Sequence, residues 1–147
     1  MIYIGADHGG YKLKEHLKKF LASEKLEFKD VGAKTFKKDD DYPEYAAKAA
    51  KEVSRNPISN VAILICRSGQ GVCIAANKFS GVRAALVWNT TEAKMSRSDD
   101  MANVLCLPAD YISPHTAENI VDSWLATPYS SELRHMRRVK KVGELDK

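Results

Sequence analysis

The sequence has few cysteines, lacks a long apolar run and carries no strong excess of charge of either sign. Three cysteines, Cys66, Cys73 and Cys106, occur in 147 residues, and their spacing fits neither a zinc site nor a disulfide framework. The N-terminal stretch "MIYIGADHGG" reaches an Asp and a His after a few apolar residues, unlike a signal peptide or a membrane span. Basic residues number 23 and acidic residues 19, so the net charge does not call for a nucleic acid partner. We expect a cytoplasmic protein without a metal centre.

The apolar residues that are present follow an alternating pattern. Short runs rich in β-branched residues are separated by longer stretches of helical period, which is typical of βαβ units in a single domain, here residues 1–147. The expected strands span 1–6, 26–32, 60–66, 82–88 and 103–109, and the expected helices span 11–24, 38–54, 71–79, 91–101, 113–127 and 131–146. The sequence therefore predicts a three-layer α/β/α Rossmann-like fold with a five-stranded parallel sheet and a basic C-terminal helix.

Polar residues follow most of these strands. In an open parallel sheet, the loops at the carboxyl ends of the strands carry the site. These loops contain Asp7 and His8 after the first strand, Asp41 and Tyr42 after the second, Cys66, Arg67 and Ser68 after the third, and "LPAD" at the end of the fifth. We expect the side chains at this edge to lie close together.

The stretch "CRSGQG" joins the third strand to a helix. Backbone N–H groups and a helix N-terminus at such a turn can bind an anion, although two glycines also serve any tight turn. The stretch is neither a Walker loop nor a dinucleotide fingerprint. Cys66 has two interpretations, a buried packing residue or a reactive thiolate favoured by the helix N-terminus and the neighbouring Arg67, and its position favours the second. Cys73 and Cys106 fall inside a helix and a strand, where packing is expected.

The histidines differ in their surroundings. His16 and His115 lie on helices where a surface position is expected. In "RHMRR", by contrast, Arg134, His135 and Arg138 are spaced to project from neighbouring parts of one helical surface. Guanidinium groups bind phosphate oxygens in pairs, so the cluster suits a phosphate, and the alternative is a solvated basic helix.

Five stretches then resemble one family. "GADHGG", "DDDYP", "GQGVCIAANK", "NVL" and "RHMRR", in this order and at these distances, resemble the type B ribose-5-phosphate isomerases, which also include galactose-6-phosphate isomerase subunits. The resemblance implies an aldose–ketose isomerase without metal or organic cofactor, which acts on a phosphorylated sugar through a cis-enediolate. It also implies a homodimer or tetramer with a site shared between subunits, and no nucleic acid or membrane partner.

The resemblance assigns roles to particular residues. Cys66 corresponds to the base that moves a proton between C2 and C1. Some relatives use a glutamate for this step instead, at the position of Val72, and a valine cannot act as a base. The enediolate would be stabilised by Ser68, Gly69 and Gly71. The remaining substrate-binding residues are Asp7 and Tyr42 on the sugar hydroxyls, His8, Arg134 and Arg138 on the phosphate, and Asp100, Arg67 and His135 beside them.

Four positions depart from the family pattern. Asp99 and Asp100 stand where the family has a ring-opening histidine followed by Asn, so Asp99 is the predicted catalytic acid. Arg67 replaces a glycine, and Asp110 stands where some relatives carry a phosphate-binding Arg. Two alternatives to a ribose 5-phosphate isomerase therefore stay open: an isomerase of allose or galactose 6-phosphate, and a non-catalytic module that binds sugar phosphates.

Overall fold

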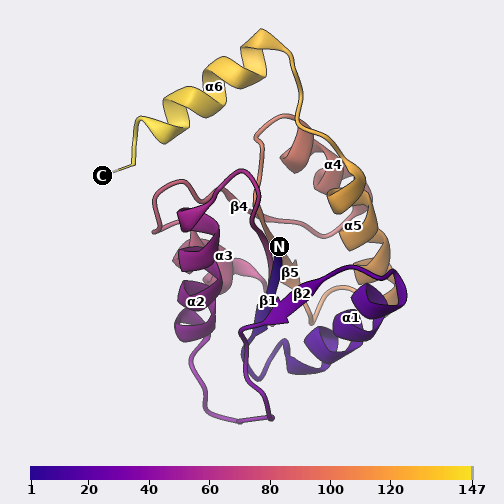
Figure 1. Cartoon of the computed structure of the whole chain (residues 1–147). Helices are drawn as coiled ribbons and strands as arrows, with labels where there is room; N and C mark the ends of the chain where they lie inside the picture. Colours follow the sequence, from indigo (N-terminus) through magenta and orange to yellow (C-terminus); the bar gives the residue numbers. More distant parts are fainter. Residues whose placement is uncertain (147) are drawn as a thin grey trace.

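Five parallel strands form a single sheet in the computed structural model, which describes residues 1–146 (Figure 1). In chain order they are β1 (Ile2–Ala6), β2 (Phe28–Asp30), β3 (Val61–Cys66), β4 (Ala84–Leu86) and β5 (Val104–Pro108), and their order across the sheet is β2-β1-β3-β5-β4. The helices are α1 (Tyr11–Ser23), α2 (Tyr42–Arg55), α3 (Gln70–Ala76), α4 (Thr90–Ser98), α5 (Pro114–Ala126) and α6 (Leu133–Gly143).

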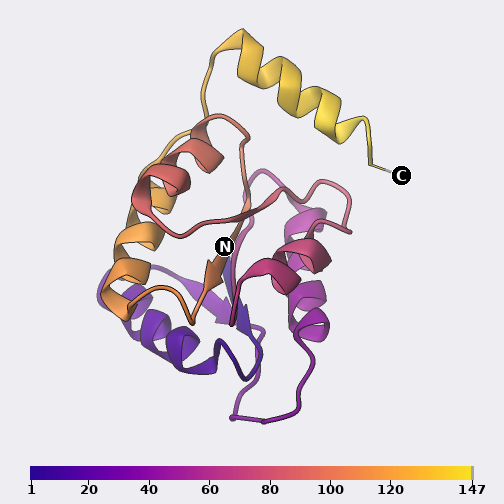
Figure 2. The same ribbon diagram turned by 180° about the vertical axis from the view of Figure 1, so that it is seen from behind.

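Two separate cores lie on the two faces of the sheet. Because successive strand residues point to opposite faces, Ile63 and Ile65 enter one core with α1, α4 and α5, around the buried Trp124. Leu64 and Cys66 enter the other core, under α2 and α3. Figures 1 and 2 show these two helical layers on either side of the sheet. The predicted three-layer fold is confirmed, and the wholly apolar β3 is buried on both faces as a central strand should be.

The edge strands are shorter than the sequence predicts. The apolar runs 26–32 and 82–88 form only the three-residue strands β2 and β4. Each of these strands pairs with a single neighbour, β2 with β1 and β4 with β5. Because an edge strand has hydrogen-bond partners on one side only, the ends of these two apolar runs are not held in the sheet and continue as loops.

The strand order reverses between β1 and β3. β1 leads on one side to β2, while β3 leads on the other side to β5 and β4. The carboxyl ends of the central strands are level, since Ala6 pairs with Ile65 and Cys66 pairs with Pro108. The crevice beside such a switch point is where doubly wound proteins bind ligands.

Helix α6 extends away from the three layers (Figures 1 and 2). Three of its apolar side chains are largely exposed, Leu133 at 80%, Met136 at 51% and Val142 at 50%, although the helix is strongly amphipathic. His135 near its N-terminal end is buried. Within residues 1–146, no helix has the length and apolar character needed to cross a membrane.

Candidate active site

One group of predicted site residues meets at the carboxyl edge of the sheet. Asp7 and His8 follow β1, the turn 67–71 follows β3, and Tyr42 begins α2. The contacts are close: a Cβ on Gly9 would lie 2.5 Å from Cγ of Arg67, and one on Gly71 would lie 2.6 Å from the Tyr42 ring. We call this group the carboxyl-edge cluster, and its members are Asp7, His8, Asp40, Tyr42, Cys66, Arg67, Ser68, Gly69 and Gly71.

The turn after β3 depends on glycine. Gly69 has a φ of 72°, and a Cβ there would lie 2.5 Å from Cδ1 of Leu86 and 3.0 Å from the Leu107 backbone. Both the backbone conformation and the close packing exclude a side chain. Ser68 lies at the mouth of the turn, where its Oγ accepts a hydrogen bond from the Gln70 backbone N–H at 3.4 Å. The sharp turn keeps the backbone N–H groups of the loop at the crevice.

Cys66 is the last residue of β3, at the carboxyl edge of the sheet. Its side chain belongs to the core under α2 and α3, and the residue is 5% exposed. Its backbone carbonyl accepts a hydrogen bond from the Ala109 N–H at 2.9 Å, which joins the ends of β3 and β5. Cys106 is fully buried in the same core, and the partly buried Cys73 of α3 packs against it. A hydrogen bond with Cys106 lowers the pKa of Cys73, and burial raises the pKa of Cys106. Cys66 is therefore the cysteine placed at the site.

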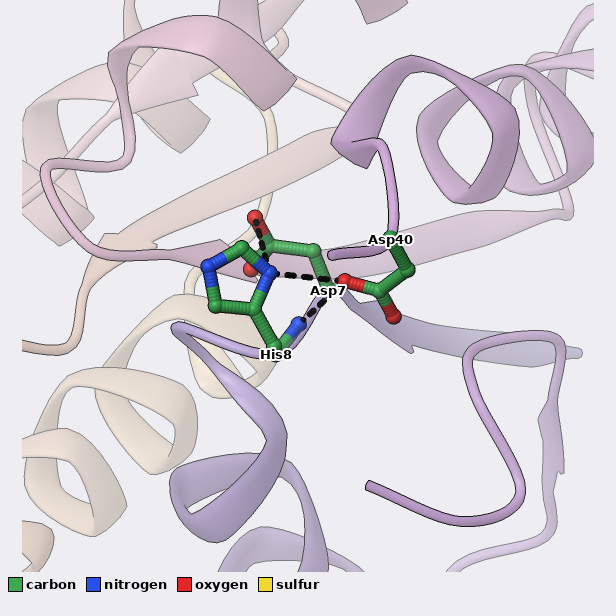
Figure 3. A group of neighbouring side chains, drawn as sticks. All are labelled: Asp7, His8 and Asp40. Carbon is green, nitrogen blue, oxygen red and sulfur yellow. Dashed lines mark hydrogen bonds and ion pairs between the residues drawn. The ribbon is translucent and has the colours of Figure 1, made fainter. Parts of the chain in front are cut away.

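Asp7, His8 and Asp40 form a compact group (Figure 3). Burial raises the pKa of the Asp7 carboxyl, and a hydrogen bond from the Gly10 N–H to its Oδ1 at 3.1 Å only partly opposes this. His8 donates both its backbone N–H and its ring Nδ1–H to Oδ1 of Asp40, each at 2.8 Å. One ligand atom from each of the three side chains lies within 4.8 Å of the others, a spacing that could hold a cation. Nδ1 of His8, however, is occupied by its hydrogen bond to Asp40.

A second group of predicted site residues lies at the opposite, amino edge of the sheet. Helix α4 runs back from the end of β4, so Asp99 and Asp100 follow it close to the start of β5. His135 places its Nδ1 3.7 Å from Oδ1 of Asp99, which also accepts a 2.5 Å hydrogen bond from Ser98 Oγ. Arg134 pairs with Glu132 at 2.7 Å. We call the residues Asp99, Asp100, Arg134, His135 and Arg138 the amino-edge cluster.

A single chain does not bring the two clusters together. The five residues of β5 separate the amino edge from the carboxyl edge, a distance of roughly 15 Å at about 3.3 Å per residue. Helix α6, which contains Arg138, projects away from the sheet (Figure 1). Within one chain, Asp99, Asp100 and the arginines therefore lie apart from Cys66, which is compatible with the predicted site shared between subunits.

Two departures from the family pattern contact one another. Nε of Arg67 lies 3.8 Å from Oδ2 of Asp110, and the Asp110 backbone N–H donates to the Arg67 carbonyl at 3.0 Å. Both side chains are largely exposed, at 73% and 52%. The additional cation and the additional carboxylate therefore form one surface ion pair at the rim of the carboxyl-edge cluster.

Asp40 was missed by the sequence reasoning. It is the second of three consecutive aspartates, and nothing in a run of identical residues indicates which one faces His8. A pocket of about 240 Å³ next to Ser68 was missed as well, since its walls come from four separate parts of the chain: Ser68 and Gln70, Leu86 and Trp88, Pro108, and Tyr111. Apolar walls beside a polar turn are typical of small-molecule sites.

Two motif residues stabilise the framework instead of the site. Asn77 of "IAANK" pairs with the backbone of Ala84, accepting from its N–H at 2.8 Å and donating to its carbonyl at 2.9 Å. Buried Asn103 of "NVL" accepts from the Arg83 N–H at 2.8 Å and donates to the Gly81 carbonyl at 2.9 Å. Both asparagines hold the edge strand β4 against the sheet.

The fold and the carboxyl-edge cluster define a doubly wound α/β protein whose candidate small-molecule site lies at the topological switch point. The model of the Ribose/Galactose Isomerase family matches residues 2–142, and the chain belongs to this family. The predicted resemblance is confirmed.

Named relatives agree in sequence and in structure. Ribose-5-phosphate isomerase B of Mycobacterium tuberculosis is 35% identical over 146 residues, which cover 99% of this chain and 90% of that protein. A solved structure of the Mycoplasma genitalium ribose-5-phosphate isomerase B, with bound ribulose-5-phosphate, matches with a TM-score of 0.94 at 38% identity over 97% of this chain and 93% of that one. The Clostridium thermocellum enzyme matches with a TM-score of 0.92 at 40% identity over 98% and 95%. The whole chain thus shares the architecture of these isomerases.

Proposed function

We propose that this protein is a cofactor-independent aldose–ketose isomerase that interconverts ribose 5-phosphate and ribulose 5-phosphate. The observation that carries the proposal is the full-length similarity to ribose-5-phosphate isomerases B, one of which was solved with ribulose-5-phosphate bound. The crevice at the switch point supports it, because a cysteine, a hydroxyl, a buried carboxyl and a histidine converge there.

The proton transfer is assigned to Cys66. In the open-chain aldose, its thiolate removes the proton from C2, the electron pair of that bond forms the C1–C2 double bond, and O1 takes the negative charge. Transfer of the O2 proton to O1 and return of the proton from Cys66 to C1 give the ketose. Val72 carries no ionisable group, so the glutamate used by some relatives has no counterpart here.

The enediolate is stabilised by the turn after β3. Backbone N–H groups of Gly69 and Gly71, with the Ser68 hydroxyl, donate to oxygens that become negative only during the reaction. Asp7 and Tyr42 orient the sugar hydroxyls from the neighbouring loops. The rigidity of the turn supports this role, because donors fixed in advance need no reorganisation when the charge develops.

The complete site is assigned to a homodimer. The amino-edge cluster supplies Asp99 as the ring-opening acid, Asp100 and His135 on the sugar, and Arg134 and Arg138 with His8 on the phosphate. Since these residues lie roughly 15 Å or more from Cys66 of the same chain, a partner subunit provides them. The exposed apolar side chains of α6 support docking on a second copy, whether in a dimer or a tetramer.

A reducing cytoplasm is the compartment proposed for this activity. Cys66, Cys73 and Cys106 are all free thiols, and the proposed mechanism needs Cys66 reduced.

Solvent-deuterium exchange followed by proton NMR tests the reaction. With ribose 5-phosphate in D2O, we expect formation of ribulose 5-phosphate and exchange of the proton at C2. Exchange with allose or galactose 6-phosphate alone would reassign the substrate. Calorimetric binding of these sugars without any exchange would instead indicate a binding module, and absence of both binding and exchange would contradict the proposed function.

A further inference from the structure

Asp40 holds His8 by two hydrogen bonds to a single oxygen. The backbone N–H and the ring Nδ1–H of His8 each lie 2.8 Å from Oδ1 of Asp40. The Asp40 side chain is only 7% exposed, so this contact is shielded from water. Figure 3 shows the second ring nitrogen, Nε2, pointing away from Asp40. The contact therefore fixes the tautomer and the orientation of the ring together.

Charged groups reach His8 from several elements. Oδ2 of Asp7, at the end of β1, lies 4.0 Å from Nδ1. Arg67, from the turn after β3, passes beside Gly9 with its aliphatic stem and pairs with Asp110 at its end. The Tyr45 phenol of α2 lies close enough for Asp40 to raise its pKa, after the larger effect of burial. The side chain of His8 is 31% exposed, so the ring remains accessible to a ligand.

We propose that Asp40 is a positioning residue, which directs Nε2–H of a cationic His8 toward the phosphate of the substrate. The inference rests on the proposed function, because it takes the phosphosugar as the ligand of His8. Asp40 itself stays on the far side of the ring and does not touch the substrate.

Protonation decides whether His8 can bind an anion. A neutral ring with its proton on Nδ1 presents only an acceptor at Nε2, whereas the imidazolium presents a charged donor. The hydrogen bond to Asp40 raises the pKa of His8, and the nearby Asp7 carboxylate adds to this against a smaller effect of burial. Burial would raise the pKa of Asp40, but the hydrogen bonds from His8 outweigh it and lower that pKa. Asp40 thus extends the cationic form of His8 to higher pH.

The matched pair Asp40→Asn and Asp39→Asn tests the proposal. Both variants remove one negative charge from the same loop, but Asp39 is exposed. The Asn side chain keeps an oxygen acceptor for His8 and loses only the charge. At pH 7.5 to 8 we expect Asp40→Asn to raise the KM for ribose 5-phosphate about tenfold with a smaller change in kcat, which corresponds to losing one charge-assisted hydrogen bond.

The pH dependence separates positioning from general damage. Dividing the KM of Asp40→Asn by that of wild type cancels the titration of the substrate phosphate. The ratio should fall toward one at pH 6, where His8 is protonated in both proteins, and Asp39→Asn should match wild type throughout. A ratio that does not change with pH, or equal KM values for Asp40→Asn and wild type, would overturn the inference.

NMR titration of the four histidines gives a readout that does not depend on turnover. The His8 resonance is assigned by its loss in His8→Gln. In wild type we expect its pKa above the ordinary value of about 6.5, and in folded Asp40→Asn a lower value. A wild-type pKa at or below 6.5 would refute the role of Asp40 even if the protein isomerises no sugar. Isomerisation with an unshifted His8 would refute this inference alone.

Discussion

Each edge of the sheet carries one Asp–His pair, and the two pairs are built differently. At the carboxyl edge, Asp40 accepts two 2.8 Å hydrogen bonds from His8. At the amino edge, Oδ1 of Asp99 lies 3.7 Å from Nδ1 of His135. This Nδ1 atom is buried and has no hydrogen-bond partner among residues 1–146. Buried polar atoms are rarely left unpaired in a finished structure. The Asp–His contact of the carboxyl edge thus forms within one chain, although Oδ2 of Asp40 is also buried without a partner among residues 1–146. At the amino edge, Nδ1 of His135 makes no such contact, and a second chain could supply one.

The division explains why the arginines stand on a projecting helix. Arg138 is exposed, and apolar side chains on the same helix are exposed as well. An amphipathic helix gains its stability from packing its apolar face. Docking α6 on a partner would bury this face and bring the arginines to a carboxyl-edge cluster that is already formed.

The largest expected effect comes from breaking the carboxyl edge at Cys66. Cys66→Ala removes the proposed base, so kcat should fall by about 10³-fold or more. Cys73→Ala removes a thiol from the same core and should retain most of the activity. Steady-state kinetics compare the variants, and circular dichroism checks that both fold. Near-normal turnover by Cys66→Ala would exclude the thiolate mechanism.

Breaking the amino edge should affect binding more than chemistry. Arg138→Ala removes a proposed phosphate contact and should raise KM about 10- to 100-fold, while the melting temperature of the exposed position stays close to that of wild type. Arg137→Ala, on the same helix and equally exposed, is the matched control. Equal KM values for the two variants would remove Arg138 from the phosphate site.

The framework of the carboxyl edge can be weakened without touching the site. Lys14 is fully buried and donates to Oδ2 of Asp30 and to the Ala33 carbonyl, both at 2.7 Å. Lys14→Met should lower the free energy of unfolding by about 3 kcal/mol, measured by urea denaturation. Lys12→Met, on the exposed face of α1, should change it little.

Acid should reduce this difference in stability. Burial alone would raise the pKa of Asp30, but hydrogen bonds from Lys14 and Lys18 outweigh it and lower that pKa. A carboxyl whose pKa falls on folding stabilises the protein above its unfolded pKa of about 3.9, and the stabilisation is lost as the pH falls through the folded value. The difference in free energy of unfolding between wild type and Lys14→Met should therefore decrease below pH 4. A difference that does not change with pH would mean that the stabilisation comes from the hydrogen bond of Lys14 to the Ala33 carbonyl.

The smallest expected effect is at the rim of the site. Asp110→Asn breaks an exposed ion pair with Arg67, so the free energy of unfolding should change by less than about 1 kcal/mol. The same change leaves the Arg67 guanidinium unpaired near His8, the proposed phosphate ligand, and should lower the KM for ribose 5-phosphate about twofold. A raised KM would show that Asp110 helps to position Arg67.

The sequence predicted features that depend on local pattern. The all-apolar "VAILIC" reads as a central strand because burial on both faces leaves no polar position, and "RSGQG" reads as a turn because its glycines have few other uses. The contact between Asp40 and His8 spans 32 residues within an acidic run, and no periodicity reports it. Likewise, the motif "RHMRR" predicts a basic helix, but its projection from the body depends on packing that no local pattern encodes.

Mixing two defective variants, assayed at a ribose 5-phosphate concentration far below the raised KM of the amino-edge variant, tests the shared site most directly. Cys66→Ala is defective at the carboxyl edge, and the double variant Arg134→Ala/Arg138→Ala is defective at the amino edge. If each site combines the two edges from different chains, random exchange gives mixed dimers with one intact site and restores about a quarter of the wild-type activity. If a single chain builds its own site, every mixed dimer has two defective sites and no activity returns, which would contradict the account.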